Sequence, residues 1–171
     1  MQILKKANYK LDNKILKDPE GREIKFEILL ISPAFERIVG PFIKNLKKLG
    51  VEASIRIVDT AQYKNRLDNY EFDMVVMARG QSLNPGNEQR NFWSSKSADI
   101  NGSANWIGIK NKTVDELIEL IINSPTREKL ILYTKVLDRV LLNNHYVIPH
   151  WHIKIWRVAY WSTIKLSLIH I

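Results

Sequence analysis

A strand, a helix and a second strand follow one another between residues 24 and 58, and this order constrains the fold more than any other feature of the sequence. Residues 24–32 (IKFEILLIS) alternate at first and then become wholly apolar, as a strand does when it enters a sheet covered on both faces. Residues 51–57 alternate throughout. Because a helix joins the two strands, we expect them to be parallel and linked by a right-handed crossover.

The helix between these strands has a start signal and a stop signal in the sequence. Ser32 supplies a capping hydroxyl, Pro33 suits the first helical position, and Gly50 permits the backbone that ends a helix. Apolar residues recur at spacings of three and four, at Phe35, Ile38, Val39, Phe42, Leu46 and Leu49. We expect this face to pack on the sheet.

The same rhythm continues after the second strand. Asp59 is expected to cap another helix, with Gln62 in the position that completes a capping box. Residues 72–78 (FDMVVMA) are a short apolar run, which is typical of a central strand covered on both faces. The sequence therefore predicts an α/β fold with a β-α-β-α-β lobe, preceded in residues 1–22 by a short helical piece and a polar turn.

Two more helices are predicted after an irregular segment at residues 94–112. Thr113 and Glu116 form the pattern of a capping box for the first, and Ser124 precedes Pro125 at the start of the second. The expected buried stripes are Val114, Leu117, Ile118 and Ile121 in the first helix, and Leu130, Tyr133, Leu137, Val140 and Leu141 in the second.

Residues 145–161 (HYVIPHWHIKIWRVAYW) predict a β-rich tail. We expect three packing anchors there: Trp151, Trp156 and Trp161. His150 and His152 would share one face of a strand, as two ligands of one metal ion would. No acidic residue lies beside them, so packed or interfacial histidines are favoured over a metal site, and no cofactor is predicted.

Composition and charge limit the classes of function. A length of 171 residues suggests one domain, residues 1–171, and the absence of cysteine excludes disulfides and thiol catalysis. A net charge of +8 would suit a small nucleic-acid-binding protein, but the basic residues are spread along the chain and no run of five occurs, so this alternative is less favoured. No phosphate-binding loop, dinucleotide fingerprint or nucleophile elbow is present, and an enzyme is not predicted.

The first ten residues (MQILKKANYK) lack the apolar core of a signal peptide. No apolar stretch approaches the ~20 residues of a membrane span, so we expect no membrane-spanning segment. Taken literally, this sequence predicts a chain that stays in the cytoplasm.

Residues 78–93 (ARGQSLNPGNEQRNFW) place a dense set of hydrogen-bonding groups directly after an apolar strand. Ligands of open α/β sheets bind outside the carboxyl ends of the strands, and neutral amides and hydroxyls suit backbone-like amides in a ligand. Alternatively, the loop only satisfies its own backbone, and Arg79 pairs either with Glu88 or with a ligand carboxylate. The candidate ligand-binding residues are Arg79, Gln81, Ser82, Asn84, Asn87, Gln89, Arg90 and Trp93, with Asn105 and Trp106 from the irregular segment.

Several stretches together resemble the C-terminal lobe of family 5 extracellular solute-binding proteins, in the branch that serves oligopeptide and microcin C uptake. They are SPAFERIVGPFIKNLKKLGVEASIRIVDTAQYKNRLDNYEFDMVV, GQSLNPGNEQRNFW, GIKNKTVDELIE and LDRVLLNNHYVIPHWHIKIWRVAYW, within about residues 1–161. The resemblance implies one lobe of a periplasmic-binding-protein type II clamshell, which closes on a peptide ligand and docks on the permease subunits of an ABC transporter. Residues 78–93 would then line the cleft.

The resemblance also has departures. In dipeptide and oligopeptide relatives an aspartate near this loop pairs with the ligand's α-amino group, but Gln81, Ser82 and Leu83 stand here, so that role is not carried over. The family's signal peptide and N-terminal lobe are not found in the sequence, and residues 162–171 do not resemble the family. We therefore expect a partial substrate-binding component of a peptide transporter. The alternatives are a non-binding gene remnant and a half-protein that needs a separate N-terminal lobe.

Overall fold

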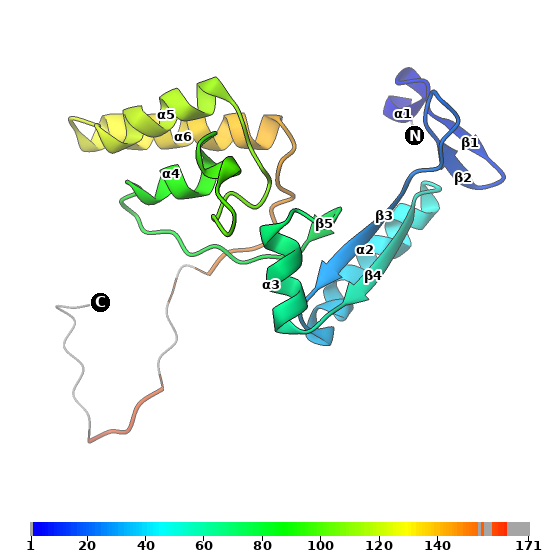
Figure 1. Ribbon diagram of the computed structural model, residues 1–171, viewed down its shortest axis with the longest axis horizontal. Coiled ribbons are helices and arrows are strands. Elements are labelled where there is room, and N and C mark those ends of the chain that lie inside the picture. Colours follow the sequence, from blue (N-terminus) through cyan, green and yellow to red (C-terminus); the bar gives the residue numbers. More distant parts are fainter. Residues whose placement is uncertain (1, 154, 156–158, 164–171) are drawn as a thin grey trace.

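The computed structural model describes residues 2–153, 155 and 159–163. Its elements are α1 (Gln2–Lys6), β1 (Lys10–Asp12), β2 (Ile15–Lys17), β3 (Lys25–Leu30), η1 (Pro33–Phe35), α2 (Glu36–Lys48), β4 (Glu52–Ile57), α3 (Thr60–Asp68), β5 (Met74–Val75), α4 (Glu88–Trp93), η2 (Ser97–Asp99), α5 (Lys112–Ile122) and α6 (Arg127–Asn143). The sheet with α2 and α3 forms one group of elements, and α4, α5 and α6 form another (Figure 1).

The order β3-α2-β4-α3-β5 confirms the predicted lobe. β3 pairs in parallel with β4, from Lys25 opposite Glu52 to Leu30 opposite Ile57, and with β5 on its other side. The strand order is therefore β4-β3-β5, and β3 is the central strand. The prediction that residues 72–78 form the central strand is wrong, because β5 lies at the edge.

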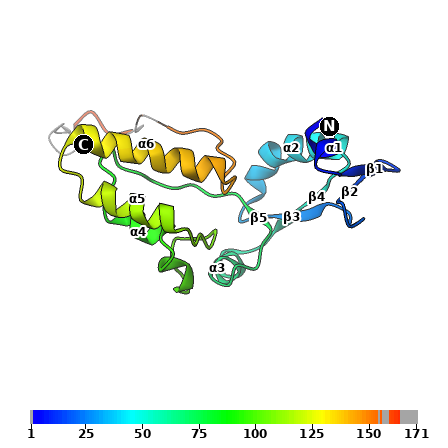
Figure 2. The ribbon, with the colours of Figure 1, turned by 90° about the horizontal axis from the view of Figure 1, so that it is seen from above.

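Coverage on both faces explains why the edge strand is as apolar as a central one. α2 lies on one face of the sheet and α3 on the other (Figure 2). Met74 and Val76 pack into the cluster on the α2 side, which is centred on Ile28, Leu30 and Val39. Val75 and Met77 pack into the cluster on the α3 side, which consists of Leu29, Tyr63 and Leu67. A continuous apolar run thus indicates that both faces of a strand are covered. It does not indicate whether the strand lies at the centre or at the edge of the sheet.

The predicted start and stop of α2 are confirmed. Ser32 Oγ accepts a hydrogen bond from Ala34 N at 3.2 Å, and a single 3₁₀ turn, η1, leads into the helix. Gly50 has φ +84° just past the helix end, where a β-carbon would lie 2.7 Å from the backbone nitrogen of Leu16. Asp59 also caps α3 as predicted, since its carboxylate accepts from Gln62 N at 2.9 Å.

A β-hairpin of β1 and β2 lies before the sheet and was missed by the sequence analysis. Asn13 and Lys14 both have positive φ, at 47° and 68°, as the two central residues of the tight turn that suits a hairpin require. Turns of this type usually have the sequence Asn-Gly. Here lysine stands in place of the glycine, so the sequence did not indicate the turn. The hairpin contacts the end of α2, where Leu16 N donates to Gly50 O at 2.7 Å.

The core between α5 and α6 confirms both predicted stripes. Val114, Leu117, Ile118, Ile121, Leu137 and Leu141 are buried in it, and Leu130, Tyr133 and Val140 pack against it. The predicted caps are wrong. Asn111 caps α5 by accepting from the backbone nitrogens of Thr113 and Val114. Thr126 caps α6 by accepting from Lys129 N, so each helix uses an eligible residue two positions away from the predicted one.

The predicted β-rich tail is not seen in the described residues after α6, which contain no strand. β-Forming composition alone does not supply the partner strand that a ladder needs. Trp151 and Trp161 have exposed fractions of 61% and 80%, so the prediction that they are packing anchors is wrong. Trp156 lies outside the described residues. Within the described part of the chain, no helix has the length and apolarity to cross a membrane.

Candidate functional site

The side chain of Arg79 follows β5 and lies against three aromatic rings. The guanidinium carbon is 4.3 Å from the ring centroids of Phe92 and Trp93 and 4.7 Å from that of Trp106. All three distances are within the range of cation–π attraction. We call Arg79 with these three residues the Arg79 cage. It brings together three of the predicted residues and one that was not predicted, Phe92.

Within the cage the guanidinium is held by few hydrogen bonds. Nη2 donates to Ala104 O at 2.6 Å, whereas Nη1 is buried with no hydrogen-bond partner among the described residues. Burial lowers the pKa of Arg79 to about 10, so the side chain is still charged at neutral pH. Of the two partners considered for Arg79, Glu88 forms no ion pair with it between these described side chains.

Residues 81–84 form the exposed tip of the loop. Ser82 Oγ donates to Asn84 O at 2.9 Å and accepts from Asn84 N at 3.1 Å, while Leu83 between them has an exposed fraction of 87%. Arg127, the first residue of α6, donates from Nη1 to Leu83 O at 2.9 Å and to the side-chain oxygen of Asn84. The tip is therefore attached to the start of α6 and does not stand alone.

The carboxylate of Glu88 holds the other end of this tip in place through hydrogen bonds. Its Oε1 accepts hydrogen bonds from Gly86 N at 2.9 Å, from Gln81 Nε2 at 3.0 Å and from Gln89 Nε2 at 3.2 Å. Burial acts to raise the pKa of Glu88, but hydrogen bonds from Gly86 N, from its own backbone N–H and from the side chains of Gln89 and Gln81 outweigh it and lower the pKa below its ordinary value. Glu88 therefore carries a negative charge at neutral pH.

The remaining predicted residues of the loop fix α4 in place. Gln89 is buried, and its Oε1 accepts from Trp93 Nε1 at 3.2 Å. Arg90 donates to both carboxylate oxygens of Glu119 on α5, at 2.7 and 2.6 Å, and to Asn87 Oδ1 at 2.7 Å. This bidentate pair orients α4 on α5, and the polar side-chain atoms of Gln89 and Arg90 are engaged within the chain.

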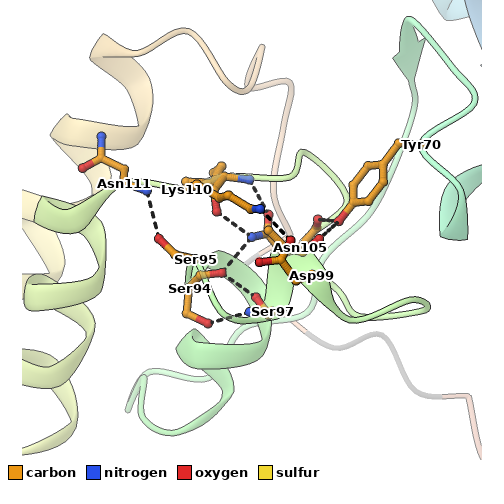
Figure 3. A network of polar contacts seen from close by, with 10 residues as sticks. Tyr70, Ser94, Ser95, Ser97, Asp99, Asn105, Lys110 and Asn111 are labelled. Atoms are coloured by element: carbon orange, nitrogen blue, oxygen red, sulfur yellow. Dashed lines mark hydrogen bonds and ion pairs between the residues drawn. The ribbon is translucent and has the colours of Figure 1, made fainter.

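Asn105 organises the irregular segment after α4, which Figure 3 shows from close by. It is 1% exposed, and its side chain makes three hydrogen bonds of 3.0 Å: Nδ2 donates to Ser94 O and Ile109 O, and Oδ1 accepts from Ile109 N. The hydroxyl of Tyr70 reaches Ala98 O at 3.2 Å and Asn105 O at 3.0 Å. Both side-chain donors of Asn105 and its side-chain acceptor are thus engaged inside the segment.

Shallow depressions of the surface do not coincide with the predicted residues. One of about 340 Å³ is lined by Pro85 together with residues 121–122, 124–127 and 130 around the turn between α5 and α6. Another, of about 620 Å³, lies on α5. Neither is lined by a predicted ligand-binding residue. No group of three or more His, Asp or Glu side chains in the described part of the chain is placed to hold a metal ion, His150 and His152 included.

Three residues of the site were missed by the sequence analysis. Phe92 could have been predicted from the sequence, because it is the neighbour of Trp93 in the same short helix. Glu88 was considered only as a partner of Arg79, although Gly86 and Gln89 are its close neighbours in sequence. Arg127 gave no signal, because its contact with Asn84 spans 43 residues.

Known proteins were found to share both sequence and fold with this chain. The model of bacterial extracellular solute-binding proteins, family 5 Middle, matches residues 1–101. Uncharacterized protein y4wM of Sinorhizobium fredii is 43% identical over 165 residues, which cover 96% of this chain and 25% of that protein. Probable peptide-binding protein YejA of Agrobacterium fabrum is 41% identical over 165 residues, covering 96% of this chain and 27% of that protein.

A solved structure agrees with the fold. The oligopeptide-binding protein AppA of Bacillus subtilis, in complex with a nonapeptide, matches 85% of this chain and 29% of its own length, with a TM-score of 0.71 and 22% identity. At that identity the likeness shows the fold alone. The chain spans about a quarter of the length of the curated relatives that it matches.

Proposed function

Because this chain belongs to the bacterial extracellular solute-binding proteins of family 5, we propose that it is part of the substrate-binding component of an ABC transporter that takes up peptides. Two similar proteins support the ligand class. YejA of Agrobacterium fabrum is a probable peptide-binding protein, and AppA of Bacillus subtilis was solved with a nonapeptide. The proposal is one of binding without chemical conversion, since the family consists of binding proteins.

The observation that carries the proposal is the exposed tip at residues 81–84, held between two anchors. Glu88 ties it to the start of α4, and Arg127 ties it to the start of α6. Neutral amide and hydroxyl groups on a held segment are suited to the alternating donors and acceptors of a peptide backbone. Because the segment is already ordered by the chain, a ligand that binds it loses less conformational entropy.

We propose that residues 79–93 form one wall of a ligand cleft. The predicted residues Gln81, Ser82, Asn84 and Asn87 would face the ligand, while the Arg79 cage, Gln89, Arg90 and Asn105 would support that wall from behind. The rest of a longer polypeptide would supply the second wall, close over the ligand by a hinge motion, and dock on the permease subunits. In this proposal the chain is a single lobe that works in the periplasm.

An amide NMR spectrum of the ¹⁵N-labelled chain, recorded during titration with trialanine, tests the proposal. We expect the amide signals of Gly80 and Gly86 to shift, while those of Gly21 and Gly50, at the far end of the sheet group, stay in place. Asn84→Ala should reduce the shifts, and Asn45→Ala, on exposed α2, should leave them unchanged. A well-dispersed spectrum that does not respond to millimolar peptide would contradict the proposal for this chain.

A further inference from the structure

The outer side of β4 is an unpaired strand edge. In the order β4-β3-β5 the strand pairs with β3 alone, and no other described strand lies against it (Figure 1). β4 has six residues, whereas β5 at the opposite edge has two. Strand edges of this kind are commonly protected from pairing by lysine or proline, and β4 (EASIRI) contains neither. The backbone of β4 is therefore open to a further strand.

The register with β3 fixes which backbone groups of β4 face outward. Glu52 N donates to Ile24 O at 3.0 Å, so the even-numbered residues of β4 point their N–H and C=O groups toward β3. Successive residues of a strand point these groups to opposite sides. Ala53 and Ile55 therefore point theirs away from β3, where no described strand meets them. A strand that pairs with β4 must form its hydrogen bonds with these odd-numbered residues.

The exposed side chains of β4 carry charges of opposite sign. Glu52, Ser54 and Arg56 are exposed and share one face of the strand. Arg56 lies 3.7 Å from Glu27 on β3, with 49% of its side chain exposed, whereas Glu52 takes part in none of the ion pairs among the described residues. A negative and a positive charge thus stand at equal distances on either side of Ser54. A strand with this pattern is complementary to itself when its direction is reversed.

We propose that β4 pairs antiparallel with β4 of a second copy of this chain, about a two-fold axis at Ser54. Glu52 of each copy then stands directly opposite Arg56 of the other. Ala53 of each copy exchanges both backbone hydrogen bonds with Ile55 of the other. The two sheets join into one sheet of six strands. This inference goes beyond the proposed function and does not depend on peptide binding.

The charges select this register among those that the backbone allows. Odd-numbered residues must pair with odd-numbered residues, so the nearest alternatives place Glu52 opposite Ser54 or opposite Val58 of the other copy, and neither pairs the two charges. Opposite charges that face each other across a strand pair stabilise it, and like charges destabilise it. On the other face of the sheet Ile57, which is 40% exposed, comes to lie opposite Val51 of the other copy and is covered by it.

Sedimentation equilibrium of the full chain over a concentration series tests the proposal. A single strand pair gives a small interface, so we expect a weak dimer with a Kd on the order of 100 µM. The mean mass should rise with concentration from that of one chain toward that of two. A chain that stays monomeric at millimolar concentration would overturn the proposal.

Cysteine cross-linking tests the register, because the chain contains no cysteine of its own. Residues at the position of Ser54 would have Cα atoms about 4.5 Å apart, which is within the range of a disulfide. We expect Ser54→Cys to form a disulfide-linked dimer when oxidised glutathione takes up the hydrogens of the two thiols. Glu52→Cys is the matched control, since its two copies would lie about 14 Å apart. A mixture of Glu52→Cys and Arg56→Cys should cross-link, although neither variant does so alone.

Charge reversal tests the ion pairs. Glu52→Arg and Arg56→Glu each place like charges opposite each other, and we expect the Kd of either variant alone to rise about 10-fold or more. An equimolar mixture of the two restores opposite charges at both positions, so it should associate as tightly as the wild-type chain. Glu71→Arg makes the same change in net charge at an exposed residue before β5, and it should leave the Kd unchanged. Circular dichroism of each variant checks that the fold is kept.

Two further results would overturn the proposed pairing even if a dimer forms. The first is equal cross-linking of Ser54→Cys and Glu52→Cys, because the copies would then meet in another register or through another surface. The second is a mixture of Glu52→Arg and Arg56→Glu that associates no better than either variant alone. Cross-linking that is specific to Ser54→Cys, together with recovery in the mixture, would support the pairing.

Discussion

Residues 81–87 and residues 94–111 are both irregular and rich in Asn, Ser and Gly, yet their polar side chains serve opposite purposes. In the second segment Asn105 is 1% exposed and bonds three backbone groups of the same segment. In the first, Gln81, Ser82 and Asn84 are exposed, and Leu83 stands out among them. The comparison shows that the polar side chains of a loop hold it together where they can reach buried backbone groups, and remain exposed where they cannot.

Among the changes to polar side chains, the largest expected effect is that of Asn105→Ala. The change leaves Ile109 N and two carbonyls without their partners in a buried place, and we expect a loss of about 3 kcal/mol of unfolding free energy. Urea unfolding followed by circular dichroism measures it. Asn101→Ala, in the same segment but exposed and with longer hydrogen bonds, should cost about 0.5 kcal/mol. Equal losses for the two variants would break the comparison.

Tyr70→Phe tests how firmly the scaffold segment is attached to the sheet group. Removal of the hydroxyl takes away a donor shared by Ala98 O and Asn105 O, and we expect a loss of about 1 kcal/mol. The matched variant is Tyr160→Phe. The Tyr160 side chain is exposed and forms no hydrogen bond with another described residue, so this variant should be neutral. Thermal unfolding of both variants checks this, and a neutral Tyr70→Phe would show that the two groups of elements do not depend on this contact.

Acid should loosen the first segment and leave the Asn105 hydrogen bonds intact. The pKa of folded Glu88 is below its ordinary value of 4.5, so its contribution is fully present above about pH 4.5 and is lost as the pH falls through the lower folded value. We expect the amide proton of Gly86, which donates to Glu88, to titrate in that range, while that of Ile109, which donates to Asn105, does not. The Gly86 titration should vanish in Glu88→Gln, and its persistence there would assign it to another group.

The smallest expected effect is that of Leu83→Ser, at the most exposed apolar side chain of the tip. Because the leucine is 87% exposed, we expect a change within about 0.5 kcal/mol. The same substitution at Ile109, which is 2% exposed in the scaffold segment, should cost roughly 3 kcal/mol or more. Chemical denaturation of the pair measures the contrast, and a costly Leu83→Ser would mean that the tip is more tightly packed than its exposure indicates.

The sequence predicted most of the fold and only part of the site, and the division has a physical cause. Strand β3, helix α2 and the buried stripe of α5 follow from periodicities that lie within a few residues. The caps of α5 and α6 were misplaced because neighbouring residues had the same capping chemistry. Which strand is central depends on pairing, and pairing is not local.

The candidate site depends even more on contacts between residues that are distant in the sequence. Residues 79–93 were correctly predicted to form a polar loop. The pattern did not indicate which side chains would bond to other groups of the chain and which would stay exposed. The Arg79 cage needs Trp106, which lies 27 positions later in the sequence, to meet the same guanidinium as Trp93. The buried state of Asn105 likewise depends on Ser94 and Ile109 folding around it. Contacts of this kind become visible only when the backbone has been placed.

The Arg79 cage also gives the molecule an optical property. Of its five tryptophans, Trp93 and Trp106 have a positive charge against the ring, whereas Trp151 and Trp161 are exposed to water. An indole's emission responds to charge and solvent beside it, so the two caged rings should emit differently from the two exposed ones and be shielded from an aqueous quencher. Any event that shifts Arg79, at the base of the loop, would thus be reported by fluorescence without an added label.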